Sequence, residues 1–212
     1  MTRMDIANEL PKDFPSHFLP KIVSAIRRAY DVNYEYFDPA GAGHNGWTFG
    51  VQVHRSLCCF IRDEIGEDDG VLAKMIWNSV EIKAGRFVMR PQKLHGVEQG
   101  VWAAMPNNPH TAQAMARENQ KSTPVLPGAD WREPTHFIIG HGGTPIDGCT
   151  TIHLCAPAKG WDESFGWELA VKIFDATEEA GAAPPVEDLA PSEEVPEFEV
   201  EPIEEGEEEG GV

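Results

Sequence analysis

The C-terminal segment of this chain, residues 177–212, limits which residues can form a folded core. It contains 14 of the 35 acidic residues and no Lys or Arg. Residues 1–176 therefore hold all 17 basic residues and the other 21 acidic ones, a net charge of −4 out of −18. A segment this rich in Glu, Pro, Gly and Ala buries too little apolar surface to offset the entropy lost on ordering. The sequence predicts a disordered acidic tail at 177–212 after a single folded domain at 1–176.

The composition of residues 1–176 is typical of an ordinary globular domain, long enough for one hydrophobic core. The N-terminus has no apolar stretch typical of a signal peptide, and no run of about 18 apolar residues occurs. We therefore expect a cytoplasmic protein with no membrane contact. Its four cysteines are too few for a disulfide framework and should be free thiols. Duplex DNA is not expected as a partner, because basic residues are not clustered.

Apolar periodicity predicts an α+β fold. Phe18, Ile22, Ile26 and Tyr30 recur every four residues, which predicts a helix with its N-cap at Ser16. Short strands joined by short connections favour antiparallel pairing, so we expect a mostly antiparallel sheet of about five or six strands with two or three helices. The expected strands are 47–54, 80–84, 87–90 (ended by Pro91), 137–139, 150–156 and 167–174, and 33–37 can form a further short strand. The other expected helices are 71–77 and one opening at Asn108-Pro109, and 57–61 is left unassigned.

Two glycine-rich segments resemble functional motifs only as strings. Gly41-x-Gly43-x-x-Gly46 matches a dinucleotide fingerprint, which requires a helix N-terminus after the glycines. Because a strand is expected at 47–54, we interpret the glycines as a connection. The run that begins at Gly140 and contains His141 could supply oxyanion-binding N–H groups, but no serine lies in a nucleophile elbow. A glycine turn is the favoured interpretation.

Polar side chains opposite the apolar faces of the expected strands form a candidate pocket. Strand alternation would place them on one polar side of the sheet, which is either a solvated face or a ligand-binding groove. The alternation would also put Cys149, His153 and Cys155 on one strand face. No spacing typical of zinc sites occurs, so neither a metal nor a cofactor is expected. The candidate pocket residues are Gln52, His54, His141, Thr151 and His153.

The acidic tail contains a short apolar pattern. Phe198 and Val200 alternate with glutamates, and Val195 and Ile203 flank them. An extended segment of this kind can add to the sheet edge of a partner, with alternate side chains in pockets. We therefore predict these residues as partner-binding anchors.

Three functions remain open. The first is a non-enzymatic binding or adaptor protein whose acidic tail engages a basic protein surface. The second is a single-stranded nucleic-acid-binding protein with a regulatory acidic tail, in which aromatic residues stack on bases. Its possible phosphate contacts are Arg86, Arg90, Lys93 and Arg132. The third is an enzyme with a pocket of His and Cys residues, acting with or without a metal, so the three alternatives include both enzyme and non-enzyme classes.

Overall fold

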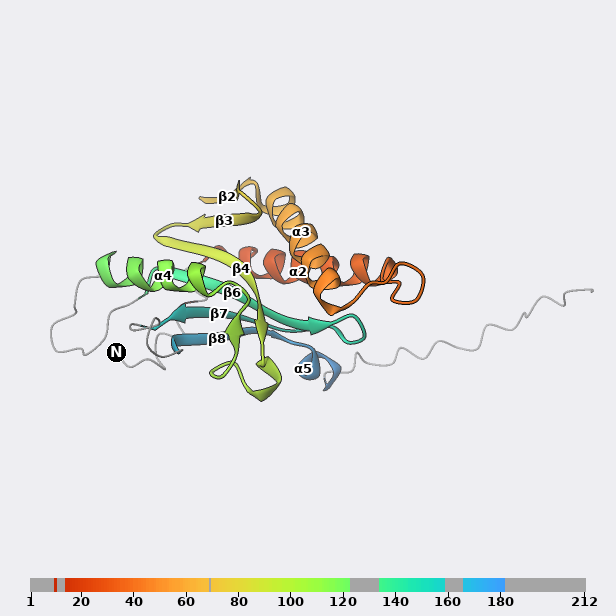
Figure 1. The fold of residues 1–212 in the computed structure, drawn as a ribbon. Coiled ribbons are helices and arrows are strands. Elements are labelled where there is room, and N and C mark those ends of the chain that lie inside the picture. Colours follow the sequence, from red (N-terminus) through yellow and green to blue (C-terminus); the bar gives the residue numbers. More distant parts are fainter. Residues whose placement is uncertain (1–9, 11–13, 69, 123–133, 159–165, 182–212) are drawn as a thin grey trace, which may run out of the picture. The chain divides into compact units, whose positions relative to one another are not determined.

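The protein has an α+β fold built on one mixed sheet (Figure 1). We describe a computed structural model, which covers residues 10, 14–68, 70–122, 134–158 and 166–181. The strand order is β1-β2-β3-β4-β6-β7-β8, and β5 pairs with β4 outside this path. Neighbouring strands are antiparallel except for β4 and β6, which are parallel. The predicted class and its mostly antiparallel pairing are confirmed.

The first two long helices pack against each other through apolar stripes. Helix α2 (Phe18–Glu35) buries the four residues of the predicted stripe, and it follows His17 rather than an N-cap at Ser16. It also continues to Glu35, so the strand expected at 33–37 is wrong. The reason is Asn33, which faces inward and donates from Nδ2 to Ala29 O at 2.7 Å and to Ser56 Oγ at 2.9 Å.

The strand expected at 47–54 is also wrong, because these residues belong to helix α3 (Gly46–Ile65). Its capping box is closed by Asn45, whose side chain accepts from Thr48 N at 3.0 Å while Thr48 Oγ1 accepts from Asn45 N at 2.8 Å. Such a box satisfies donors that a helix start leaves unpaired. The apolar period is four residues when a longer window is taken. The buried stripe is Phe49, Val53, Leu57, Ile61 and Ile65.

After α3 the chain forms a run of antiparallel strands. Strand β1 (Glu67–Asp68) pairs with β2 (Val71–Ile76), and β2 pairs with β3 (Ser79–Ala84) through a two-residue loop. The helix expected at 71–77 is wrong, because Val71 and Ala73 are buried and alternate with exposed Leu72 and Lys74. That period of two is the period of a half-buried strand.

Strand β4 (Phe87–His95) links the two halves of the sheet. It pairs with β3 only from Phe87 to Met89, whereas its pairing with β6 (His136–Thr144) runs from Val88 to Lys93. Pro91 therefore does not end the strand as expected. The ladder with β3 has already stopped at Met89, so no β3 residue loses a donor to the proline. Beyond Met89 the ladder with β3 does not continue, and β5 pairs with β4 further along, at Leu94 and His95.

The remaining strands and helix α4 (Pro109–Ser122) complete three layers. Strands β7 (Gly148–Pro157) and β8 (Trp167–Asp175) confirm the last two predicted strands, and α4 begins where Asn108-Pro109 predicted. Helices α2 and α3 pack with Ile139 and Leu154 on one face of the sheet. Helix α4 packs with Ile138 and Cys155 on the other. Between β4 and α4 lie the short helix η2 (Val97–Gln99) and β5 (Met105–Pro106).

The chain remains helical past the predicted boundary of the tail. Helix α5 (Ala176–Gly181) follows β8, so residues 177–181 of the segment predicted to be disordered form part of a helix. Thr177 N and Oγ1 both donate to Asp175 Oδ1, at 3.0 and 2.6 Å, which caps this turn. Residues 182–212 lie outside the described residues. None of the helices in the described ranges is both long and apolar enough to span a membrane.

Candidate functional site

The five predicted pocket residues do not share one pocket. Gln52 and His54 lie on α3, His141 lies on β6, and Thr151 and His153 lie on β7. Only His54 lines a first cavity, and only Thr151 and His153 line a second one. The predicted polar sheet face required a strand at 47–54, and the helix found there separates these residues.

His141 is fully buried on the α2 side of the sheet. Its Nδ1 is 2.9 Å from the Tyr30 hydroxyl, and the two rings meet edge to face. Burial, with His54 and Lys93 nearby, lowers the pKa of His141 to about 3, and burial raises the pKa of Tyr30 above its ordinary value. A neutral imidazole is therefore held in the core. His141 Nε2 and Gln52 Oε1 are the two buried side-chain polar atoms without a hydrogen bond among the described residues.

The cysteines and histidines do not assemble into a metal site within the part of the chain that the structure describes. Cys149 packs in the α2–α3 layer and Cys155 packs under α4, on opposite faces of the sheet. This corrects the expected common face of Cys149, His153 and Cys155. The cause is a register shift at Gly142/Gly143, where β6 pairs successively with Thr151 and Cys149 and skips Thr150. Burial raises the pKa of Cys58 to about 11 and that of Cys149 to about 12, so both thiols stay protonated at neutral pH.

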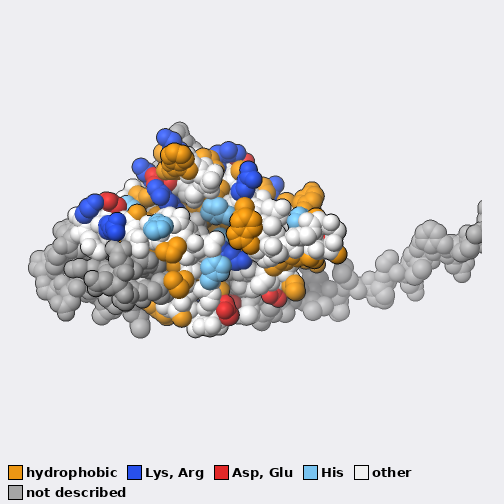
Figure 2. Space-filling model, viewed as in Figure 1, with side chains coloured by type: hydrophobic (Ala, Val, Ile, Leu, Met, Phe, Trp, Pro, Cys, Tyr) orange, Lys and Arg blue, Asp and Glu red, His pale blue; other side chains and the backbone are white. Residues whose placement is uncertain are grey.

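The first cavity, which we call the Lys93 cleft, opens where β4 separates from β3. It has a volume of about 390 Å³, and Figure 2 shows His, Lys and Arg side chains gathered around the middle of this face. Its walls come from α3, the β2–β3 loop, β4 and the start of α4. The residues that line it include Gly50, His54, Trp77, Asn78, Arg90 and Lys93.

Two of the cationic side chains in this cleft differ in their partners. Arg90 donates from Nε and Nη2 to Glu81 Oε2 at 3.2 and 2.7 Å, so its charge is compensated. Lys93 is half-buried, and no ion pair or hydrogen bond of its ammonium occurs within the described ranges. Desolvation lowers the pKa of Lys93. A half-buried cation without a counter-charge is unfavourable, so the cleft favours an anionic group.

His54 connects the cleft wall to the β2–β3 loop. Its Nε2–H donates to Asn78 O at 3.2 Å, because a carbonyl oxygen can only accept. The Cys58 sulfur, four residues further along α3, lies 3.7 Å from the same nitrogen. Burial lowers the pKa of His54. The histidine therefore has a definite tautomer and fixes the loop to α3.

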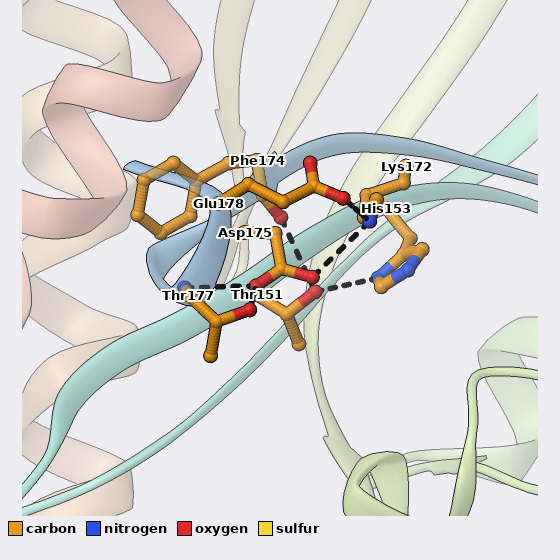
Figure 3. Close-up of polar contacts among 7 residues, drawn as sticks. All are labelled: Thr151, His153, Lys172, Phe174, Asp175, Thr177 and Glu178. Carbon is orange, nitrogen blue, oxygen red and sulfur yellow. Dashed lines mark hydrogen bonds and ion pairs between the residues drawn. The ribbon is translucent and has the colours of Figure 1, made fainter. Parts of the chain in front are cut away.

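The second cavity, which we call the His153 groove, lies against β7, β8 and the segment around η2. It has a volume of about 890 Å³ and shares Lys93 with the first. Figure 3 shows its central contacts: Thr151 Oγ1 donates to Phe174 O at 3.2 Å and lies 3.2 Å from His153 Nδ1. Because the hydroxyl proton goes to the carbonyl, His153 Nδ1–H must donate to Thr151. The remaining nitrogen, Nε2, is then an acceptor available to the groove.

The His153 side chain is neutral at physiological pH. Burial, with a smaller contribution from the nearby Lys172 ammonium, lowers its pKa to about 4. Lys172 itself forms ion pairs with Asp175, at 3.2 Å, and with Glu178. Hydrogen bonds from Thr177 and Lys172 lower the pKa of Asp175 to about 2. Chemically, the groove presents His153 Nε2 as a hydrogen-bond acceptor beside side chains that already bind one another.

Neither glycine motif has the structure of its functional counterpart. The helix required by the dinucleotide fingerprint does follow Gly46, so the expectation of a strand there is wrong, but the element before the glycines is α2 and not a strand. Asp38 closes this loop by accepting from Gly41 N at 2.7 Å. Gly140, His141, Gly142 and Gly143 lie within β6 rather than in a turn. A Cβ on Gly140 would be 2.5 Å from Leu94 Cδ1, so the missing side chain admits Leu94.

The sequence did not indicate Trp77 or Gly50 as site residues. Trp77 is 96% exposed in the β2–β3 loop, and Gly50 lies in the second turn of α3 beside Lys93. The Trp-Asn pair that joins β2 to β3 is not one of the glycine-containing pairs typical of two-residue hairpins, so it gave no local signal. Lys93 was considered only as a possible phosphate contact, and Arg132 lies outside the described residues. So do the predicted anchors Val195, Phe198, Val200 and Ile203.

Comparisons with known proteins do not assign this chain to a class. No protein-family model matches the chain, and no curated protein or solved structure matches it either.

Proposed function

We propose that this chain is a cytosolic, non-enzymatic binding protein whose acidic C-terminal segment engages a basic surface of a protein partner. One observation carries the proposal: residues 177–212 hold 14 acidic residues and no basic one, while residues 1–176 have a net charge of −4. Such a segregated negative charge attracts cationic surfaces and speeds encounter with them. The protonated thiols of Cys58 and Cys149 agree with this proposal, since neither is an activated nucleophile.

The apolar residues of the tail would give this attraction specificity. Phe198, Val200 and Ile203 alternate with or follow glutamates, and Val195 precedes them. Charge alone would hold any cation, whereas apolar side chains add affinity only where a partner offers matching pockets. The partner would thus combine a basic rim with an exposed sheet edge or an apolar groove.

Truncation tests this proposal, and helix α5 sets where to truncate. A chain ending at Gly181 keeps the contacts of Thr177 with Asp175 and of Lys172 with Glu178, so the body should stay intact. We expect affinity capture from cell extract to recover a partner with the full chain, and to recover less of it with the truncated chain. Added salt should weaken the complex of the full chain more steeply than that of the truncated chain, because screening shortens the range of charge attraction to about 10 Å at 0.1 M salt.

A second variant separates specific binding from simple polyanion attraction. Replacing Phe198, Val200 and Ile203 by serine leaves every tail charge in place. We expect this variant to lose the partner as the truncated chain does. Equal capture of the partner by the full and truncated chains rejects the proposal. Equal capture by the full chain and the serine variant rejects the role of these three residues as anchors.

The second candidate is a single-stranded nucleic-acid-binding protein in which the acidic tail competes with the strand. The Lys93 ammonium, which has no ion-pair partner among the described residues, favours it, because such proteins combine cationic grooves with exposed aromatic side chains. Titrating a fluorescent single-stranded oligonucleotide with the full chain and with the chain ending at Gly181 tests it. The truncated chain should bind more tightly, and absence of binding by both chains at low salt rejects it.

A further inference from the structure

Three features of the Lys93 cleft are unfavourable for the protein alone. The first is the Lys93 ammonium. It lies beside α3, with its Nζ 3.9 Å from where a Cβ on Gly50 would be, and no described residue neutralises it. On β6 its sheet neighbour is the neutral His141, which provides no negative charge. An anionic ligand would supply the missing counter-charge.

The second feature is Trp77. It is the one non-glycine residue with positive φ, 55°, among the described residues, and it is 96% exposed. It occupies the first position of the two-residue loop that joins Ile76 to Ser79. A positive φ at that position alone is the pattern of a hairpin turn that favours glycine. Neither backbone preference nor core packing accounts for a tryptophan there, and such outliers cluster at binding sites.

The third feature is Gly50, a glycine in the second turn of helix α3. Glycine weakens a helix interior because it loses the most backbone entropy on folding. No neighbour requires it here: a Cβ would be 3.8 Å from Lys93 Cδ, an ordinary contact distance. What the glycine does provide is space beside the Lys93 ammonium.

These three features face one volume. Gly50 and His54 are four residues apart on α3, so they lie on one side of the helix with a rise of about 6 Å between them. Gly50 adjoins Lys93, and His54 fixes Asn78 and with it the Trp77 loop. The cation and the exposed aromatic residue therefore border the same cleft.

We propose that the Lys93 cleft binds a nucleoside phosphate, with the base stacked on Trp77 and the phosphate paired with Lys93. An aromatic face with no packing partner accepts a flat base, and an ammonium with no counter-ion accepts a phosphate. The cleft volume of about 390 Å³ falls within the range of small-molecule sites. A free nucleotide and one unit of a single strand share this chemistry. The inference rests on the second candidate function only for the strand, and it is independent of the tail.

Calorimetric titration of the full-length protein tests the inference. The probes are the common ribonucleoside monophosphates, each matching nucleoside without phosphate, and inorganic phosphate alone. We expect a monophosphate to bind, its nucleoside to bind about tenfold more weakly, and phosphate alone to bind more weakly than either. Trp77→Ala and Lys93→Gln should each lower the affinity for the monophosphate about tenfold, the size typical of one lost stacking or charge-assisted contact.

Matched controls come from the same surface. Trp102 is also an exposed tryptophan and Lys74 lies on the same hairpin as Trp77, but neither lines the cleft. Trp102→Ala and Lys74→Gln should bind as the wild type does. Thermal unfolding of all variants verifies that each is folded. We expect Trp77→Ala to fold, because the Trp77 side chain is exposed and does not belong to the core. The inference is overturned if no monophosphate binds, or if binding is equal in the Trp77 and Lys93 variants and the wild type.

A short single-stranded oligonucleotide separates this inference from the second candidate function. Binding of monophosphates but not of the strand would support the cleft and reject the nucleic-acid-binding function. Binding of the strand with equal affinity by the wild type, Trp77→Ala and Lys93→Gln, together with no binding of any monophosphate, would support the nucleic-acid-binding function and overturn the cleft as a ligand site. Loss of both kinds of binding in both variants would support the two together.

Discussion

The Lys93 cleft and the His153 groove, which share Lys93, differ in whether their central side chains have partners in the protein. In the His153 groove, Thr151, His153, Lys172 and Asp175 are hydrogen-bonded or ion-paired with protein groups. In the Lys93 cleft, the ammonium of Lys93 and the ring of Trp77 lack partners in the described part of the chain. Satisfied polar groups stabilise the folded chain, whereas groups left without partners are available to a ligand.

The two cavities also differ in how much space surrounds a glycine that lines each of them. A Cβ on Gly143, which lines the groove, would lie 2.1 Å from Gly148 O and 2.6 Å from Tyr30 Cε1. A Cβ on Gly50, which lines the cleft, would meet nothing closer than 3.8 Å. The fold requires the first glycine and does not require the second. Substitutions and pH changes that affect either the groove or the cleft test this difference.

Gly143→Ala should have the largest effect. The added methyl must displace backbone at Gly148 or the Tyr30 ring that contacts His141, and φ at this position is +155°. We expect a loss of roughly 3 kcal/mol in the free energy of unfolding, measured by urea titration. A loss below about 0.5 kcal/mol would mean that β6 and β7 can separate here and that Gly143 is not required.

Acid should destabilise the protein by the next largest amount. Burial lowers the folded-state pKa of His141 to about 3 and that of His153 to about 4, from a usual value near 6.5. The unfolded chain therefore binds protons first, so stability is complete above about pH 6.5 and falls as the pH decreases toward the folded pKa values. His141 alone should account for roughly 2–3 kcal/mol between pH 7 and about pH 4.5, as an upper limit.

Urea titrations across that pH range measure the effect. Proton titration followed by NMR assigns it, because both rings should stay neutral at pH 6. A stability that is constant down to about pH 4.5, or a His153 ring that titrates near 6.5, would show that the groove is more hydrated than its hydrogen bonds indicate.

Thr151→Val should have a moderate effect on the groove. It removes the hydroxyl that donates to Phe174 O and accepts from His153 Nδ1–H, leaving both groups without that partner. We expect a loss of about 1–2 kcal/mol in unfolding free energy and a shift of the His153 proton away from Nδ1, seen in ¹⁵N NMR shifts. Thr150→Val is the matched control, since no hydrogen bond of the Thr150 hydroxyl occurs in the described ranges. Equal results for the two variants would contradict the tautomer assigned to His153.

The fold class and most long elements could be predicted because their periodicity extends over many residues. The stripe of α2 and the apolar alternation in the sequences of β7 and β8 are of this kind. The segment 47–54 misled because Trp47, Phe49, Val51 and Val53 alternate over a short window. Trp47 is 74% exposed, so it is not a core residue and the alternation is accidental. Only the continuation to Leu57, Ile61 and Ile65 identifies the helix.

The candidate site could be predicted much less well, because it depends on contacts between distant elements. His54 was identified as a pocket residue, but for a strand face that does not exist. The cleft arises from the separation of β3 and β4 after Met89, and no local pattern in the sequence predicts that separation. Trp77 and Gly50 violate local preferences, and sequence reasoning treats such residues as ordinary members of an expected helix or strand.

Gly50→Ala should have the smallest effect, and the opposite sign. Alanine at this position in the second turn of α3 should raise the free energy of unfolding by about 0.5–1 kcal/mol, because it reduces the entropy of the unfolded chain. The same methyl would fill space beside Lys93 Nζ, so nucleotide affinity should fall severalfold while Lys93 stays in place. Urea titration and calorimetry on one preparation measure both. A destabilised variant would mean that Gly50 is as structural as Gly143, and a stabilised variant with full affinity would mean that the space beside Lys93 is not used by the ligand.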